Sequence, residues 1–154
     1  MTRTKLSEQV ESFHRAMGQP VLSHPQVPGE NRVRLRLRLV AEEFCELLEA
    51  SLALLDSEKA ELRAHLQRVL DEVPCAVVLP DVADALADLD YVVEGTRLEL
   101  GINGAPIADA VHESNMAKLG GAVRADGKIQ KPAHWAPPDI VAALRAQGWV
   151  DDAP

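Results

Sequence analysis

Four glutamates crowd into a short stretch of this chain: Glu42, Glu43, Glu46 and Glu49. In an α-helix Glu42, Glu46 and Glu49 would line one face, with Glu43 at its edge. Like charges at this spacing destabilise a helix by roughly 0.2–0.5 kcal/mol per pair. Residues 39–55 include no lysine or arginine to offset this repulsion. A hard divalent cation, which prefers oxygen ligands, is the simplest group that would neutralise these carboxylates.

A second acidic stretch follows at Asp81, Asp84 and Asp88, again at spacings that share one helical face. The opposite face carries the apolar residues Val82, Leu86, Leu89 and Val93. One such acidic face would be typical of a solvated helix surface. Two of them, both without interleaved bases and both backed by apolar stripes, favour a metal site between antiparallel helices.

The elements that must position these acids are expected to be helices throughout. Apolar spacing of three and four residues predicts helices over 5–17, 32–55, 58–70, 81–100, 106–118 and 139–147. Within the second of these, 32–39 alternates strictly between arginine and apolar residues, which is a strand signal. We predict helix there because no partner strand is evident. Asp56 and Ser57 are expected to break the chain and cap the next helix, and 122–138 is expected to be a loop.

Composition bounds the possible functions. A chain of 154 residues is long enough for one domain, which we place over 1–154. Its formal net charge of −8 makes a nucleic-acid backbone an unfavourable partner. Cys45 and Cys75 are too few for a disulfide framework, and no cysteine–histidine cluster has zinc spacing. The chain shows no signal-peptide pattern and no membrane-spanning apolar run, so we expect a cytoplasmic protein without membrane contact.

The first acidic stretch resembles a known family motif. Glu42-Glu43-Phe-Cys-Glu46 is similar to the EExxE motif of the all-α nucleoside triphosphate pyrophosphatase superfamily, which includes MazG-like proteins and dimeric dUTPases. The family's second motif, ExxD, has two registers here. Asp81-Val-Ala-Asp84 has the right spacing with Asp in place of Glu. We prefer the register with Asp88 at the motif Asp, because the sequence around and after it is more similar; Ala85 then replaces the Glu, and Asp84 supplies the missing carboxylate.

Two later segments extend the resemblance, which covers about residues 10 to 140. Ser114-Asn-Met-Ala-Lys118 is similar to the family's Asn-x-x-Lys motif, and 125–132 resembles the basic loop of the dUTPase-like members. The segment 58–70 would be an insertion. The resemblance implies an all-α bundle of about four core helices with these site residues: metal ligands Glu43, Glu46, Asp84 (or Asp81) and Asp88; catalytic Glu42, to orient water, and Glu46; substrate contacts Asn115, Lys118 and Lys131, with Lys128 beside them.

The implied activity is hydrolysis of a nucleoside triphosphate to the monophosphate and pyrophosphate, which cleanses the nucleotide pool. Mg²⁺ would be the cofactor, with Mn²⁺ as a substitute, and dUTP is the first expected substrate. Whether the α- or the β-phosphorus is attacked stays open. The apolar residues on more than one side of 81–100 also predict a homo-oligomer, a dimer or a dimer of dimers.

Two other classes of protein would tolerate the same patterns. A carboxylate-bridged di-metal protein needs facing acids but usually brings Glu-x-x-His pairs on two helices, and Glu11-Ser-Phe-His14 is the one match. A non-catalytic helical interaction protein would carry acidic faces by chance. Trp135 and Trp149 are expected to pack in the interior, although Trp135 could also stack on a base.

Overall fold

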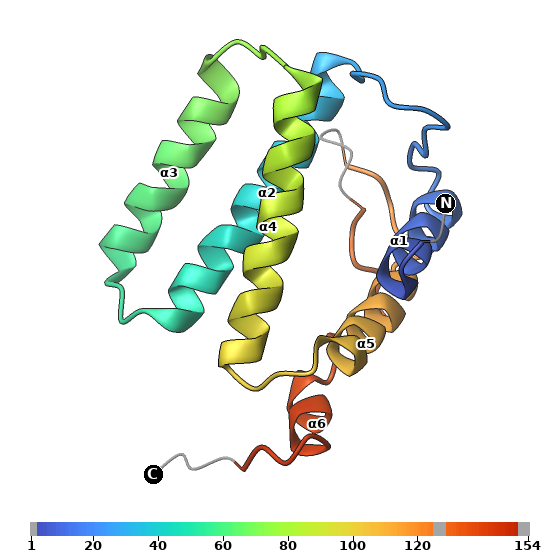
Figure 1. Ribbon diagram of the computed structural model, residues 1–154, viewed down its shortest axis with the longest axis vertical. Helices are drawn as coiled ribbons and strands as arrows, with labels where there is room; N and C mark the ends of the chain where they lie inside the picture. The colour runs from blue at the N-terminus through green and yellow to red at the C-terminus, as the bar shows by residue number, and fades with distance from the viewer. Residues whose placement is uncertain (1–2, 125–128, 151–154) are drawn as a thin grey trace. The chain divides into compact units, whose positions relative to one another are not determined.

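The computed structural model of the chain is built from helices and describes residues 3–124 and 129–150 (Figure 1). These ranges contain α1 Lys5–Ala16, α2 Glu30–Ser51, α3 Asp56–Glu72, α4 Leu79–Glu99, α5 Gly104–Met116 and α6 Ile140–Arg145. Their one β pairing is an isolated antiparallel bridge between Val123 and Ile129. The predicted all-α class is confirmed. Two compact units make up the chain, one of Gln26–Leu79 and the other of Met1–Pro25 with Pro80–Pro154.

The unit Gln26–Leu79 is an antiparallel hairpin of α2 and α3, joined by residues 52–55 (Figure 1). Polar contacts fasten it at both ends. Near the connecting loop, Arg63 binds both carboxylate oxygens of Glu49, at 2.7 and 2.9 Å. At the far end, Arg38 of α2 pairs with Asp71 of α3. Hydrogen bonds from Gln67 and from Arg38 lower the pKa of the Asp71 carboxyl. Cys45, on α2, is buried, as its size suggests.

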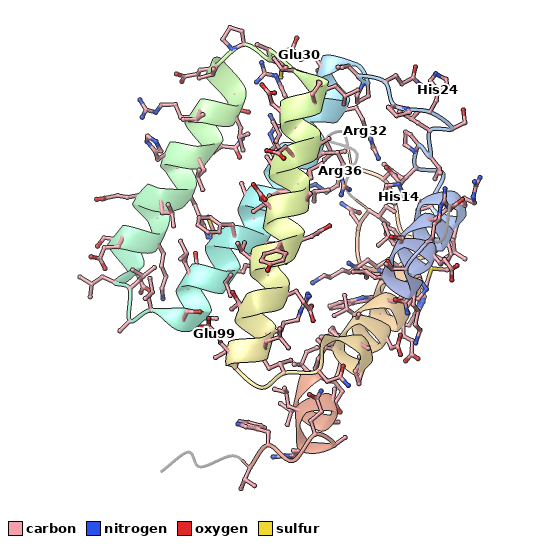
Figure 2. All side chains as sticks on the ribbon, in the orientation of Figure 1. His14, His24, Glu30, Arg32, Arg36 and Glu99 are labelled. Atoms are coloured by element: carbon pink, nitrogen blue, oxygen red, sulfur yellow. The ribbon has the colours of Figure 1, made fainter. Side chains whose placement is uncertain are left out.

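The alternating segment at the start of α2 is helical, as predicted, and its arginines separate onto two faces. Arg34 donates to the backbone carbonyls of Leu70 and, at 3.0 Å, of Val73. It thereby satisfies carbonyls at the carboxyl end of α3, where a cation is also favoured by the helix dipole. Arg32 and Arg36 lie on the other face, in the same half of α2 (Figure 2).

The predicted cap at Asp56 and Ser57 needs a correction. The helix α3 begins at Asp56, so both residues lie in its first turn, and Leu55 occupies the capping position. The Glu58 carboxylate accepts a hydrogen bond from the Leu55 backbone N–H at 2.7 Å. A glutamate three residues into a helix can therefore close this end although the capping residue is apolar.

In the second unit, α1 and α5 lie side by side (Figure 1). The Asp109 carboxylate of α5 accepts hydrogen bonds from Lys5 at 2.6 Å and from Gln9 at 2.7 Å, both on α1. The Gln147 side chain, just beyond α6, pairs with the backbone N–H and carbonyl of Asn103, at 2.7 and 3.2 Å. Asn103 is the N-cap of α5, so this amide pair ties the end of the α6 segment to the start of α5.

The helix boundaries follow local chemistry. Gly18 and Gly101 stop α1 and α4 with φ values of 64° and 69°, a left-handed conformation that suits glycine. The side chains of Asn103 and Asp139 cap α5 and α6 by accepting hydrogen bonds from backbone N–H groups. No helix in the described ranges combines the length and apolar composition needed to cross a bilayer.

Candidate functional site

The first acidic motif lies on α2 in the unit Gln26–Leu79. Glu43 and Glu46 are exposed and Glu42 is half-buried. The exposed pair is three residues apart, which places the two carboxylates about one helical turn from each other. Both can therefore be offered to a single ligand outside the helix.

Glu49, the fourth acid of this stretch, is already neutralised within the protein. Arg63 of α3 holds both of its oxygens, and the hydrogen bond from Arg63 lowers the pKa of the Glu49 carboxyl. The lack of lysine and arginine in residues 39–55 therefore does not leave Glu49 uncompensated, because Arg63 of the next helix neutralises it. The argument for a cation at this motif therefore cannot count Glu49.

The second acidic motif lies on α4, in the other unit. Every residue from 80 to 94 is exposed, including Asp81, Asp84 and Asp88. The apolar residues predicted for the opposite face of this helix are exposed as well: Val82 40%, Leu86 52%, Leu89 44% and Val93 40%. Within its own unit, α4 therefore has exposed side chains on both its acidic and its apolar face.

The two acidic motifs belong to different compact units, so their convergence stays a prediction. Across residues 3–124 and 129–150, no three aspartate, glutamate, histidine or cysteine side chains gather as a metal site. The chemistry of the donors fits a hard cation all the same. Each motif offers exposed carboxylate oxygens about one turn apart, and Mg²⁺ prefers such ligands.

A third group of residues gathers at the end of α5, within the unit of α1, α4, α5 and α6. Lys118 donates to the side-chain oxygen of Asn115 at 2.7 Å, which brings together the two residues of the predicted Asn-x-x-Lys motif. Both side chains are half-buried. Because Asn115 orients the ammonium group, Lys118 is set in one direction before any ligand arrives.

Lys131 joins this group at the ring of Trp135. The Nζ of Lys131 lies 3.9 Å from the indole centroid, and the Nζ of Lys118 lies 5.9 Å from it. Two of the predicted substrate contacts, from separate segments, thus meet beside one aromatic side chain. We name Asn115, Lys118, Lys131 and Trp135 the lysine cluster. Lys128, the other predicted basic contact, lies outside the described residues.

Trp135 was expected to pack in the interior or to stack on a base, and its place beside two lysines was not predicted. Its indole N–H donates to the Ser114 carbonyl at 2.9 Å, and the buried Ser114 hydroxyl donates to the Ala136 carbonyl at 2.8 Å. Nothing in the spacing of these residues indicates that two lysines share the ring. The sequence offers only a tryptophan between Pro132 and Pro137 in a segment with basic residues.

Comparison with known proteins shows the family and the fold of the chain. A protein-family model described as phosphoribosyl-ATP pyrophosphohydrolase matches residues 10–115. A crystal structure of a candidate NTP pyrophosphohydrolase from Exiguobacterium sp. 255-15 is similar, with a TM-score of 0.67 and 27% sequence identity. That similarity covers 96% of this chain and 95% of the other. No curated protein matches the sequence.

Proposed function

Because this chain belongs to the phosphoribosyl-ATP pyrophosphohydrolase family, we propose that it hydrolyses a nucleoside triphosphate to the monophosphate and pyrophosphate in a Mg²⁺-dependent reaction. Membership of the family makes the protein a hydrolase of phosphoanhydride bonds. The reaction would remove unwanted nucleotides from the pool. The identity of the nucleotide and the requirement for Mg²⁺ are the parts of this proposal that go beyond family membership.

The observation that carries the proposal is the lysine cluster. A chain with a formal net charge of −8 repels a polyphosphate unless cations are concentrated where it binds. Lys118 and Lys131 supply two ammonium groups within 5.9 Å of one ring centroid. Charge-assisted hydrogen bonds from such groups to phosphate oxygens are among the stronger polar contacts in proteins.

The metal would be held by the two acidic motifs. We assign Glu43 and Glu46 of α2 and Asp84 and Asp88 of α4 as its ligands, with Asp81 as the alternative to Asp84. When bound, a Mg²⁺ ion supplies positive charge that stabilises the phosphoryl oxygens and the leaving pyrophosphate. Mn²⁺, which takes the same oxygen ligands, would substitute.

The chain's own residues have separate tasks in the reaction. Glu42 accepts a hydrogen bond from the attacking water and orients it, while Glu46 would be one of the carboxylates that hold the metal ion. Lys118 and Lys131 donate to phosphate oxygens, and Asn115 holds the Lys118 ammonium in place. The water oxygen then forms a new bond to phosphorus and gives up a proton to the Glu42 carboxylate, while the bridging P–O bond breaks and pyrophosphate leaves with the electron pair of that bond.

We propose two substrates to be tested first. dUTP is the first, because the similarity to dimeric dUTPases extends to the segment 125–132. Phosphoribosyl-ATP is the second, because the matched family is described by hydrolysis of that compound. Both contain a triphosphate, so the same lysines and carboxylates would serve either one.

A pyrophosphate-release assay tests the proposal. The purified chain is given canonical, deaminated and oxidised nucleoside triphosphates and phosphoribosyl-ATP, each with Mg²⁺, with Mn²⁺ and with chelator. We expect release of pyrophosphate from at least one substrate, dependent on the metal, and near-complete loss in Glu46→Gln because an amide is a poorer ligand for a hard cation. Metal-independent release, or full activity in Glu46→Gln, would refute the assigned site. No turnover of any substrate would favour the non-catalytic interaction protein.

A further inference from the structure

The ring of Trp135 is fixed in position by hydrogen bonds to its indole edge and to its backbone, which leave the faces of the ring open to other contacts. The indole N–H is bound to the Ser114 carbonyl at 2.9 Å, on the last turn of α5. The Trp135 backbone N–H donates to the Pro132 carbonyl at 3.0 Å. The Ser114 side chain is buried, and its hydroxyl donates a hydrogen bond to the backbone carbonyl of Ala136, the residue that follows Trp135. Both the edge and the backbone of this tryptophan are therefore anchored.

The aromatic ring of Trp135 lies beside the ammonium groups of two lysines. The Lys131 ammonium lies 3.9 Å and the Lys118 ammonium 5.9 Å from the ring centroid, within the range at which a cation is attracted to an indole. Two positive charges beside one ring also repel each other. An anion that reaches both ammonium groups gains from both charges, and a phosphate chain offers enough oxygens to do so.

Gly121 connects the two segments that carry the lysines. Its backbone N–H donates to the Lys118 carbonyl at 3.0 Å. A Cβ atom at Gly121 would lie 2.1 Å from the carbonyl oxygen of Gln130, so only glycine permits this approach. The Gln130 N–H also donates to the Ala122 carbonyl at 2.8 Å. The backbone before Lys131 is thus held against the backbone after Lys118, and both side chains start close to the ring.

We infer that Trp135 is a positioning residue, whose indole holds Lys118 and Lys131 together as a clamp for the phosphate chain of the nucleotide. This inference rests on the proposed function and adds a residue to it. Trp135 does not touch the reacting atoms. It acts by keeping both ammonium groups beside each other, so that less side-chain freedom is lost when the phosphates bind.

The test measures binding of inorganic pyrophosphate by calorimetry, with turnover absent. We compare the wild-type chain with Trp135→Leu, which removes the ring, and with Trp149→Phe, a control near the carboxyl end of the chain. We expect Trp135→Leu to weaken pyrophosphate binding about tenfold and to raise KM for the nucleotide with a smaller change in kcat, because two cation–π contacts are lost. Trp149→Phe should bind like wild type.

A double-mutant cycle separates positioning from packing. In the Lys118→Ala/Lys131→Ala background, Trp135→Leu should weaken pyrophosphate binding less than twofold, because no ammonium groups remain to be held. An equal loss in both backgrounds would mean that Trp135 only supports the fold, and would overturn the inference. If Trp135→Leu does not fold, Trp135→Phe carries the same cycle, with a smaller loss that must again depend on the lysines.

The binding of pyrophosphate and the hydrolysis of nucleotide are measured separately, so a failure of the clamp can be told from a failure of the proposed reaction. A chain that hydrolyses no nucleotide but shows the lysine-dependent loss of pyrophosphate binding would retain the clamp and refute the reaction. A metal-dependent hydrolase whose pyrophosphate affinity and KM are unchanged by Trp135→Leu would retain the reaction and refute the clamp.

Discussion

Glu46 and Glu49 lie one turn apart on α2 but differ in what surrounds their charges. Glu49 is held by two hydrogen bonds from Arg63, whereas Glu46 is exposed and has no hydrogen bond within residues 3–124 and 129–150. A paired carboxylate contributes to the stability of the hairpin. The Glu46 carboxylate makes no ion pair at contact distance among the described residues, although the pKa of Arg63 is raised by its hydrogen bond to Glu49 and, to a smaller extent, by the Glu46 charge. The exposure of Glu46 leaves it accessible to a ligand.

This difference predicts opposite effects of two matched substitutions on thermal melting. Glu46→Gln should leave the metal-free chain as stable as wild type or slightly more so, since one repulsive charge is gone. Mg²⁺ bound only by the folded wild type raises its melting temperature by mass action, and this rise should shrink in Glu46→Gln. Glu49→Gln should melt lower than wild type and keep the full Mg²⁺ effect. A Glu46→Gln chain that unfolds without metal would contradict the assignment.

Lys118 allows substrate binding to be separated from metal binding. Lys118→Ala removes a charge-assisted contact to phosphate worth roughly 1.5–3 kcal/mol, so kcat/KM should fall roughly ten- to hundredfold. The Mg²⁺-induced rise in melting temperature should persist, because Lys118 lies in neither acidic motif. Steady-state kinetics and melting curves provide the two measurements. Unchanged kcat and KM would remove Lys118 from the site.

At the scale of elements, one carboxylate fastens α1 to α5. Hydrogen bonds from Lys5 and, secondly, from Gln9 lower the pKa of the Asp109 carboxyl. A lowered folded-state pKa means that this contact stabilises the protein fully above the pKa of the unfolded chain, about 3.9 for aspartate. The stabilisation is lost as the pH falls from there through the folded-state pKa.

Asp109→Asn should therefore lower the free energy of unfolding at pH 7 and approach wild type as the pH falls below about 4. Denaturant unfolding at pH 7, 5 and 3 measures the difference. Glu61→Gln is a suitable control, because Glu61 is exposed on α3 and has no hydrogen bond or ion pair among the described residues. A difference between Asp109→Asn and wild type that stays constant over this range would exclude the carboxylate as its source.

The order of the helices was predictable from sequence because each has an apolar stripe and chemical stops. The start of α2 was harder, since alternating arginines fit a strand as well as a helix. The helical conformation is favoured by a contact with the carboxyl end of α3, where Arg34 donates hydrogen bonds to the carbonyls of Leu70 and Val73. That partner lies far along the chain, and no local pattern indicates it.

The candidate site was predictable motif by motif, and its tertiary pairs were not. Asn115 and Lys118 are close because a helix end brings them together. The neutralisation of Glu49 by Arg63 depends on how two helices pack, and the sharing of Trp135 by two lysines depends on the approach of Gly121 to Gln130. The residues in these contacts are too far apart in the sequence to be paired by the periodicity of a helix or a strand.

At the scale of the whole molecule, α4 exposes more apolar surface than a single chain normally leaves in water. Leu86 and Leu89 are 52% and 44% exposed, and Tyr91 and Val92 add 81% and 57%. A helix that is apolar on more than one side requires a covering surface. A second copy of the chain, packed on α4, would provide it next to Asp84 and Asp88.

We therefore predict a homodimer, or a larger assembly of dimers, at micromolar concentration. Leu86→Glu should shift the mass measured by light scattering towards that of one chain, because a charge would have to be buried in the contact. Leu55→Glu, at a leucine that is 66% exposed on the loop between α2 and α3, should leave the mass unchanged. A wild-type chain that is monomeric under these conditions would contradict the prediction.

The pairing of α1 with α5 also determines when the protein can fold during its synthesis. Lys5 and Asp109 are 104 positions apart in the chain. At a typical elongation rate of about 5–20 residues per second, α1 leaves the ribosome roughly 5–20 s before its partner helix. Leu6 and Val10, which line one pocket with Ile107 and Val111 of α5, lack these neighbours during that interval. The hairpin of α2 and α3 has no such delay, because residues 52–55 alone separate its two helices.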